Sequence, residues 1–446
     1  MACKEEKVLV TFLDRDDPVE LPLVDSCEEL WRYAARKILK VKPTVLDIFG
    51  LKCNECWLTP SDPVPRAFKK LELRLRFKPP QASRLKRIDL PAFRYYYSQV
   101  RYDLNHGRLL KIFTVDINKS NKNGKWYFPF IADKEAAKEA KKKRVQFLSS
   151  VVTAVSLNII VDILSGVRDK DTAMSQFESY LPDEIWVNVA EKQLIGLREL
   201  KQTASKVVDK TLSDKAVTVD LVKEKFLRTI ETNLSEYFHE IFDVYLRSLE
   251  SKQAEAVTIK VVPPCKDNEP YLALYKHRHP EQKLCDIEEI CNISTNVDDD
   301  GVVSMEIARK NGIPLHLAIK NTNDGWSFLT LLTGYYRLCE KWIFCLCPAV
   351  IYPSLNKLLD SKTHGPVDNQ FVIEKFKASP ERQQVGTYLI RRSCDNHFTY
   401  FLHYVFISNV SEGGVMDRSM KVIMYICWLV TCSFPRKYKN PMQCTK

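Results

Sequence analysis

The sequence predicts a multidomain protein of the α+β class, because its hydrophobic periodicity changes twice along the chain. Its 446 residues exceed the roughly 250 at which single cores stop growing, so two to four domains are expected. Strand-like stretches occupy residues 7–78, helical spacing dominates residues 85–253, and short strands return after residue 255. A further α+β stretch begins near residue 354.

Residues 1–80 predict a compact first domain with the element order of a ubiquitin-like β-grasp. Two short strands around a polar turn suggest a hairpin. Ser26 and Glu29 then form a capping box for a helix that Pro43 stops. Residues 71–78 alternate apolar and charged side chains, which is typical of a half-buried strand with a charged outer face.

Residues 85–253 predict a helical bundle, and residues 255–347 predict a β-sandwich or open barrel closed by a helix. Long helices are expected at 133–165 and 219–249, where apolar residues recur every three or four positions. Asn323 or Asp324 is expected to cap the closing helix. Strands are expected at residues 256–262, 271–276, 287–293, 302–308 and 314–319.

The charge and the cysteine content limit the partners and the compartment. Basic residues exceed acidic ones by 11, which favours an anionic partner without choosing among lipid headgroups, phosphorylated peptides and nucleic acid. The 14 scattered cysteines and the polar N-terminus predict reduced, cytosolic thiols. The longest apolar run that we recognise, Val422–Phe434, is shorter than the roughly 18 residues of a membrane span, so peripheral association is favoured over spanning.

A basic cluster begins the first long helix. It is either a solvated helix face or a contact with anionic lipid near a membrane or receptor. Nucleic acid is disfavoured as its partner, because the aromatic interleaving of nucleic-acid-binding surfaces is missing. The cluster comprises Lys138, Lys141, Lys142, Lys143 and Arg144.

Motifs of known enzymes are incomplete or absent. Residues 317–320 are similar to the strand lysine of protein kinases, but the glycine-rich loop and catalytic loops of kinases are missing. Cys53-Asn54-Glu55-Cys56 has the spacing of a zinc knuckle, yet no second C-x-x-C pair supplies the other ligands. We therefore expect no enzyme activity, no cofactor and no metal.

The most specific string is Gly386–Ser393, which is similar to the signature of Src-homology-2 domains. The resemblance implies that Arg391 lies at the floor of a phosphotyrosine or acidic-peptide pocket and that Ser393 adds a hydrogen bond. A planar guanidinium can grip a phosphate through two parallel bonds. Asn369 occupies the position where the family often places a second basic phosphate ligand. Without that basic residue, ordinary phosphotyrosine affinity is expected to be weakened or abolished. The domain, at 354–410, is expected to be incomplete, with a divergent tail at 411–446.

The three preceding units resemble a FERM module with ubiquitin-like, helical and pleckstrin-homology-like lobes. FERM followed by Src-homology-2 is the arrangement of the Janus kinase family, here in an invertebrate-like form. Phe93–Tyr97, Gly334–Leu338 and His364-Gly365-Pro366 resemble strings of that family. The resemblance implies docking on the membrane-proximal cytoplasmic tail of a cytokine receptor, at the inner face of the plasma membrane or an endomembrane. Full-length relatives are non-receptor tyrosine kinases, and their catalytic domains are not recognisable here, so a truncated form or a decoy is expected.

Three alternatives belong to other classes. The first is a FERM linker between membrane proteins and the cortical cytoskeleton, in which Arg391 has no binding role. The second is a phosphotyrosine-binding adaptor in its own right. The third is an enzyme, with this chain as the N-terminal piece of a longer kinase.

Overall fold

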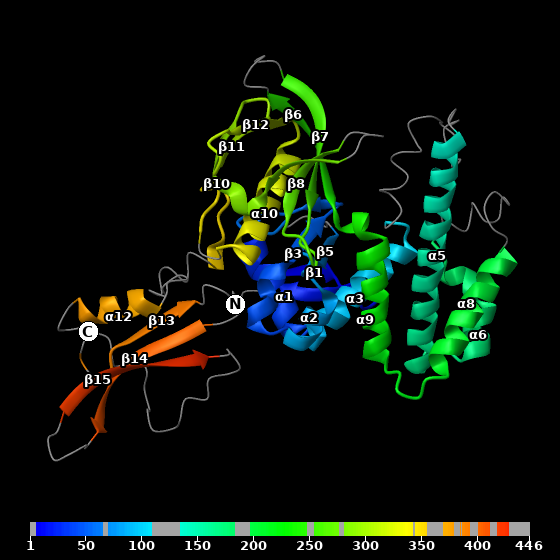
Figure 1. Cartoon of the computed structure of the whole chain (residues 1–446), viewed down its shortest axis with the longest axis horizontal. Coiled ribbons are helices and arrows are strands. Elements are labelled where there is room, and N and C mark those ends of the chain that lie inside the picture. Colours follow the sequence, from blue (N-terminus) through cyan, green and yellow to red (C-terminus); the bar gives the residue numbers. More distant parts are fainter. Residues whose placement is uncertain are drawn as a thin grey trace.

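The computed structural model describes the residues that make up most of the chain. These are residues 6–65, 70–108, 134–182, 197–247, 254–275, 281–341, 344–354, 369–378, 384, 386–392, 400–410 and 417–427. Three lobes share one continuous hydrophobic core that reaches from Val10 to Tyr352. Figure 1 shows these lobes and a smaller C-terminal unit, which we define as residues 369–427.

The first lobe is a five-stranded sheet in the order β2-β1-β5-β3-β4, packed against helix α1 (Cys27–Lys37). Ser26 caps α1 as predicted, because its side chain accepts a hydrogen bond from the backbone of Glu29 at 3.3 Å. Strands β1 and β5 are parallel, and the remaining pairs are antiparallel. The strands are β1 (Lys7–Thr11), β2 (Val19–Pro22), β3 (Phe49–Cys53), β4 (Cys56–Trp57) and β5 (Leu71–Leu75).

The expected charged outer face of β5 is not exposed. Glu72, Arg74 and Arg76 are only 7%, 4% and 7% exposed, because the other two lobes cover this face. Alternation therefore predicted the strand correctly and the solvent exposure of its charged face wrongly. Apolar and charged residues alternate here because two different surfaces are buried, a hydrophobic core and a polar junction between lobes.

The second lobe is helical, with α5 packed against α8 and α9 (Figure 1). Its helices are α2 (Ala82–Ile88), α3 (Leu90–Asn105), α5 (Lys134–Leu164), α6 (Lys170–Ser175), α8 (Leu197–Leu212) and α9 (Val219–Asn233). The stretch Gln146–Leu164 of α5 is long and apolar enough to cross a membrane by length and composition, contrary to our estimate from the sequence, but most of it is buried inside this lobe. We therefore describe it as a core helix.

The helix expected at 219–249 is wrong in its second half. Helix α9 ends at Asn233, and strand β6 (Glu240–Arg247) follows a short 3₁₀ turn. Buried Phe242 and Val244 are two residues apart, which is strand periodicity. Strand β6 pairs with two strands of the third lobe, so that lobe begins at residue 240 and not at 255.

The third lobe is a seven-stranded sheet in the order β10-β11-β12-β6-β7-β8-β9, closed by helix α10 (Thr322–Cys339). All five predicted strands are present within a few residues, and β9 was missed along with β6. Asn321, not Asn323 or Asp324, caps α10 with its side-chain oxygen. The other strands are β7 (Ala254–Val262), β8 (Tyr271–Tyr275), β9 (Gln282–Asp286), β10 (Ile290–Val297), β11 (Val303–Arg309) and β12 (Leu315–Ile319).

The C-terminal unit has its own small core and a three-stranded antiparallel sheet. Helix α12 (Asn369–Lys377) contributes Val372 and Phe376 to that core. Strand β13 (Tyr388–Arg392) pairs with β14 (Tyr400–Val410), which pairs with β15 (Asp417–Cys427). Strand β15 lies in the segment expected to be a divergent tail, so the sheet extends past residue 410 and contains the third strand that the sequence did not reveal.

Candidate functional site

The predicted pocket residue Arg391 is buried on β13 and is only 3% exposed. Its Nε donates a hydrogen bond to Nε2 of His403 at 3.0 Å, and its Nη2 donates one to the side-chain oxygen of Asn369 on α12. The guanidinium also lies 4.3 Å from the centre of the Phe401 ring. The structure thus brings together two of the three residues that the sequence placed in this pocket.

His403 supports Arg391 as a neutral acceptor. Burial, together with the charge of Arg391, lowers the pKa of His403 to about 4. At neutral pH the imidazole is therefore uncharged and can accept the bond from Nε. His403 was not predicted as a site residue, although it lies opposite Leu389 in the β13–β14 ladder, two positions from Phe401, which is the ladder partner of Arg391.

The remaining sequence-predicted site residues are not placed in detail. Ser393 lies outside the described residues. The basic cluster is on the first turns of α5, but the described side chains of that helix begin at Gln146. The side chains of this cluster are Lys138, Lys141, Lys142, Lys143 and Arg144.

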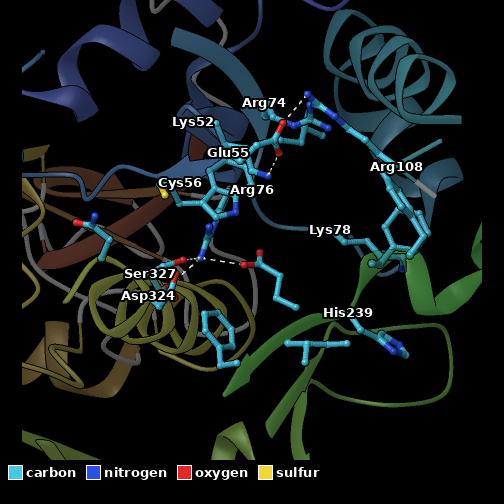
Figure 2. A pocket seen from close by; sticks show the side chains of 18 of the residues that line it. Lys52, Glu55, Cys56, Arg74, Arg76, Lys78, Arg108, His239, Asp324 and Ser327 are labelled. Carbon is cyan, nitrogen blue, oxygen red and sulfur yellow. Dashed lines mark hydrogen bonds and ion pairs between the residues drawn. The ribbon is translucent and has the colours of Figure 1, made fainter. Parts of the chain in front are cut away.

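A second candidate site is a hollow of about 630 Å³ at the junction of the three lobes, which we call the central hollow (Figure 2). Arg74 of β5 and Arg76, just after this strand, line it, and α3 contributes Asp103. The third lobe contributes Glu240 from β6 and Ser327 from α10. Charged residues of three lobes therefore face one space.

A buried ionic network forms one wall of the central hollow. Arg74 pairs with Asp103 and, at 3.3 Å, with Glu72. Arg108 pairs with Glu72 at 3.3 Å, and the Tyr237 hydroxyl donates to Asp103. Burial opposes the charge of Arg74, but Asp103, Tyr237 and Glu72 together outweigh this effect and leave the pKa of Arg74 raised. Arg74 therefore stays charged at neutral pH.

Arg76 joins the first lobe to the third beside this network. Its Nη2 donates to the backbone and side-chain oxygens of Ser327 at 2.9 and 3.0 Å, and it lies 3.3 Å from a carboxylate oxygen of Glu240. The guanidinium stacks 4.3 Å from the Trp57 ring centre. Burial lowers the pKa of Arg76, and Glu240 opposes that effect. Arg76, just after β5, therefore links this strand to β6 and α10.

The charged residues of the central hollow connect the lobes to one another. Five of the six lysine and arginine side chains that line it pair with nearby carboxylates, and the sixth, Lys320, lies over the Tyr245 ring, so the described wall offers an anion little surplus positive charge. Within the described ranges, no group of three or more histidine, cysteine, aspartate or glutamate side chains could hold a metal ion. His239, whose pKa burial lowers to about 4, is neutral there.

The Gly334–Leu338 string has a structural role at the same joint. The Phe77 ring packs edge-on against Tyr335 at 5.3 Å, and the Tyr335 hydroxyl accepts a hydrogen bond from the backbone of Lys78. Arg337 lies 3.9 Å from the ring centre of Tyr352. A Cβ atom on Gly334 would lie 2.0 Å from the Phe77 ring. This glycine lets the first lobe approach α10.

The three lobes together define a FERM-type module, and an additional α+β unit follows it. A β-grasp sheet, a helical lobe and a seven-stranded sheet closed by a helix meet around one core. These lobes and the C-terminal unit account for the described residues, which contain no kinase fold.

Curated relatives are tyrosine kinases that match short stretches of the chain. Tyrosine-protein kinase JAK3 of Rattus norvegicus is 31% identical over 127 residues, which are 27% of this chain and 11% of that protein. Tyrosine-protein kinase hopscotch of Drosophila melanogaster is 27% identical over 122 residues, 27% of this chain and 10% of its own length. Tyrosine-protein kinase JAK1 of Danio rerio is 30% identical over 91 residues, 20% of this chain and 8% of its length. The chain spans about a tenth of these relatives, and the similarity supports a Janus-kinase-like FERM region.

No protein-family model matches the chain. The MyTH4-FERM MF2 domain of Dictyostelium discoideum Myosin VII gives a TM-score of 0.48 at 12% identity, over 74% of this chain and 58% of that one. The MF1 domain of the same protein gives a TM-score of 0.41 at 10% identity, over 74% and 59% of the two chains.

Proposed function

We propose that this chain is a receptor-attachment module of Janus kinase type, which docks on the membrane-proximal cytoplasmic tail of a cytokine receptor. The observation that carries the proposal is the buried Arg391 in a unit that directly follows a FERM-type module. The similarity to three tyrosine kinases supports the same assignment. In this proposal the FERM-type lobes and an SH2-like C-terminal unit hold the tail together.

The proposed ligand of Arg391 is an acidic group of the tail, a carboxylate or a phosphotyrosine. Asn369 and His403 accept hydrogen bonds from Arg391 as neutral groups. An incoming anion takes the place of the Asn369 oxygen, because it adds an opposite charge beside the guanidinium and can accept two parallel hydrogen bonds from it. Because Asn369 competes and adds no charge, we expect weaker phosphate binding than a pocket with a second cation would give.

The basic cluster is proposed to face the membrane. Each lysine or arginine near an anionic leaflet contributes about 1 kcal/mol. The five residues Lys138, Lys141, Lys142, Lys143 and Arg144 would therefore favour a peripheral position at the cytoplasmic face, where receptor tails emerge.

The test is a titration of the full chain with labelled peptides of membrane-proximal cytokine-receptor tails, with and without phosphotyrosine. Arg391→Ala should weaken binding about tenfold or more, since a hydrogen bond to a charged group contributes 1.5–3 kcal/mol. Asn369→Ala should tighten binding several-fold, because it removes the competing amide. Tighter binding cannot be explained by misfolding of the variant. Arg94→Ala, at an exposed arginine paired with Asp220, is the matched control and should bind as wild type.

The outcomes separate this proposal from its alternatives. Tail binding that ignores Arg391 and Asn369 would contradict the pocket while keeping a FERM-mediated attachment. Binding to phosphotyrosine peptides of any sequence, without preference for receptor tails, would indicate an adaptor. Failure to bind any tail, together with co-sedimentation with actin filaments, would indicate a cytoskeletal linker. If the 446 residues act as a decoy, co-expression should lower the phosphorylation that a full-length kinase produces at the shared receptor.

A further inference from the structure

Two cysteines face each other across the tightest hairpin of the first lobe. In the β3–β4 ladder Cys53 is the direct partner of Cys56, with Asn54 and Glu55 as the turn. Both turn residues have positive φ, 48° and 72°, as a two-residue type I′ hairpin requires. In antiparallel ladders the pair that flanks such a turn has Cα atoms about 5.5 Å apart. That is the commonest Cα separation of disulfides, roughly 5.5–6 Å.

The side chains are also directed suitably. Residues directly opposite in an antiparallel pair project from the same face of the sheet. Cys53 is buried at the edge of the core, whereas Cys56 is exposed at its rim. The hairpin therefore places one exposed and one buried thiol opposite each other, in a ladder geometry whose Cα separation suits a disulfide.

No other cysteine pair has this arrangement among the described ladders. Cys265, Cys291 and Cys345 are exposed, but none of them is a ladder partner of another cysteine. Exposure alone thus does not distinguish Cys56, whereas its position opposite Cys53 does.

We propose that Cys53 and Cys56 form a reversible disulfide and that this hairpin is a site of oxidation by hydroperoxides. The Cys56 thiolate attacks the peroxide, whose O–O bond breaks, and becomes a sulfenic acid while hydroxide leaves. The Cys53 thiol then attacks the sulfenic sulfur and forms the S–S bond, and water leaves. Two thiols lose two electrons and two protons in total, and hydrogen peroxide is reduced to two waters.

The proposed bond lies at the rim of the central hollow. Trp57 follows Cys56 on β4, and its ring lies 5.0 Å from Nζ of Lys52 and 4.3 Å from the guanidinium of Arg76. Strand β4 also packs against α10 of the third lobe. Oxidation would fix the strand that carries Trp57, so the redox state of the hairpin is coupled to the joint between lobes.

The sequence allows a direct test by mass spectrometry. Trypsin cleaves after Lys52 and Arg66 and releases a peptide that contains both cysteines of the hairpin and no others. The full chain is treated with a small excess of hydrogen peroxide, unfolded in denaturant so that buried thiols are accessible, alkylated with N-ethylmaleimide and digested. We expect this peptide to lack both alkyl groups and to be two hydrogen atoms lighter than the reduced form. Dithiothreitol before alkylation should restore both alkylation sites.

Two variants complete the experiment. Cys56→Ser, an exchange at an exposed position, should leave Cys53 alkylated and abolish the cross-link. Cys345→Ser, at an exposed cysteine outside the hairpin, should leave the cross-link unchanged. The proposal is overturned if Cys56 proceeds to sulfinic or sulfonic acid while Cys53 stays alkylatable, or if Cys56 bonds only to another molecule.

Discussion

Replacing Gly334 by alanine is expected to destabilise the joint between the first and third lobes, against the local preference of the helix. Alanine is favoured over glycine within a helix by about 1 kcal/mol. However, the new Cβ would lie 2.0 and 2.2 Å from two carbons of the Phe77 ring, where carbon atoms normally keep 3.5–4.0 Å. The ring must therefore move by about 1.5 Å or more, or α10 must withdraw from β5.

The magnitude follows from how little room the ring has. Phe77 is 5% exposed and is held edge-on by Tyr335, so no open space receives it. Overpacking of a tight core costs typically 1–3 kcal/mol, and expelling the ring altogether approaches the 3–5 kcal/mol of a phenylalanine-to-alanine change. After the gain in helix propensity, we expect Gly334→Ala to lower the free energy of unfolding by about 1–3 kcal/mol.

A double-mutant cycle in urea unfolding checks this reasoning. Phe77→Ala removes the ring that the new methyl group meets, so the double variant should be more stable than the sum of the two single effects predicts. A coupling of about 0.5–3 kcal/mol is expected for groups in contact. If Gly334→Ala were as stable as wild type, or if the two effects were strictly additive, the close approach of Phe77 to α10 would not require glycine at position 334.

Two further changes probe the buried polar groups. Asp103→Asn should lower the free energy of unfolding by about 3–5 kcal/mol, because Arg74 loses its partner carboxylate within a buried network. A denaturant titration measures this change, and a decrease of less than about 1 kcal/mol would contradict the explanation. The pKa of His403 is about 4 in the folded state and about 6.5 in the unfolded state, so the unfolded state binds the proton first as the pH falls. The free energy of unfolding should therefore fall by up to about 3 kcal/mol between pH 6.5 and pH 4. His403→Gln keeps an acceptor for Arg391 and should remove that part of the pH dependence.

Local patterns in the sequence revealed most elements, and the errors occurred where two patterns coincide or where burial depends on distant residues. Residues 240–247 contain apolar positions that fit both helical spacing and alternation, and only pairing with β7 and β12 decides for a strand. The exposure of β5 could not be judged from its own alternation, because residues more than 100 positions away cover it.

The two candidate sites differed in the same way. Arg391 could be found because its motif is continuous in sequence, and strand alternation alone places it inward. The central hollow could not, since Arg74, Asp103 and Glu240 belong to three lobes and none of them lies in a recognisable string. Charged residues at alternate positions of a strand predict a buried polar interface only when the polar surface that covers them is known.

The burial of charge at this joint has a consequence for how the lobes are oriented. A buried ionic network adds little net stability, because desolvation offsets the attraction, but breaking one partner is costly. Apolar surfaces tolerate sliding, whereas Arg76 satisfies Ser327 and Glu240 in one arrangement of β5, α10 and β6. We infer that the charges of β5 fix the relative position of the lobes more than they stabilise the fold. A receptor tail that contacts more than one lobe would then meet a preorganised surface, and the affinity would not be reduced by ordering the lobes.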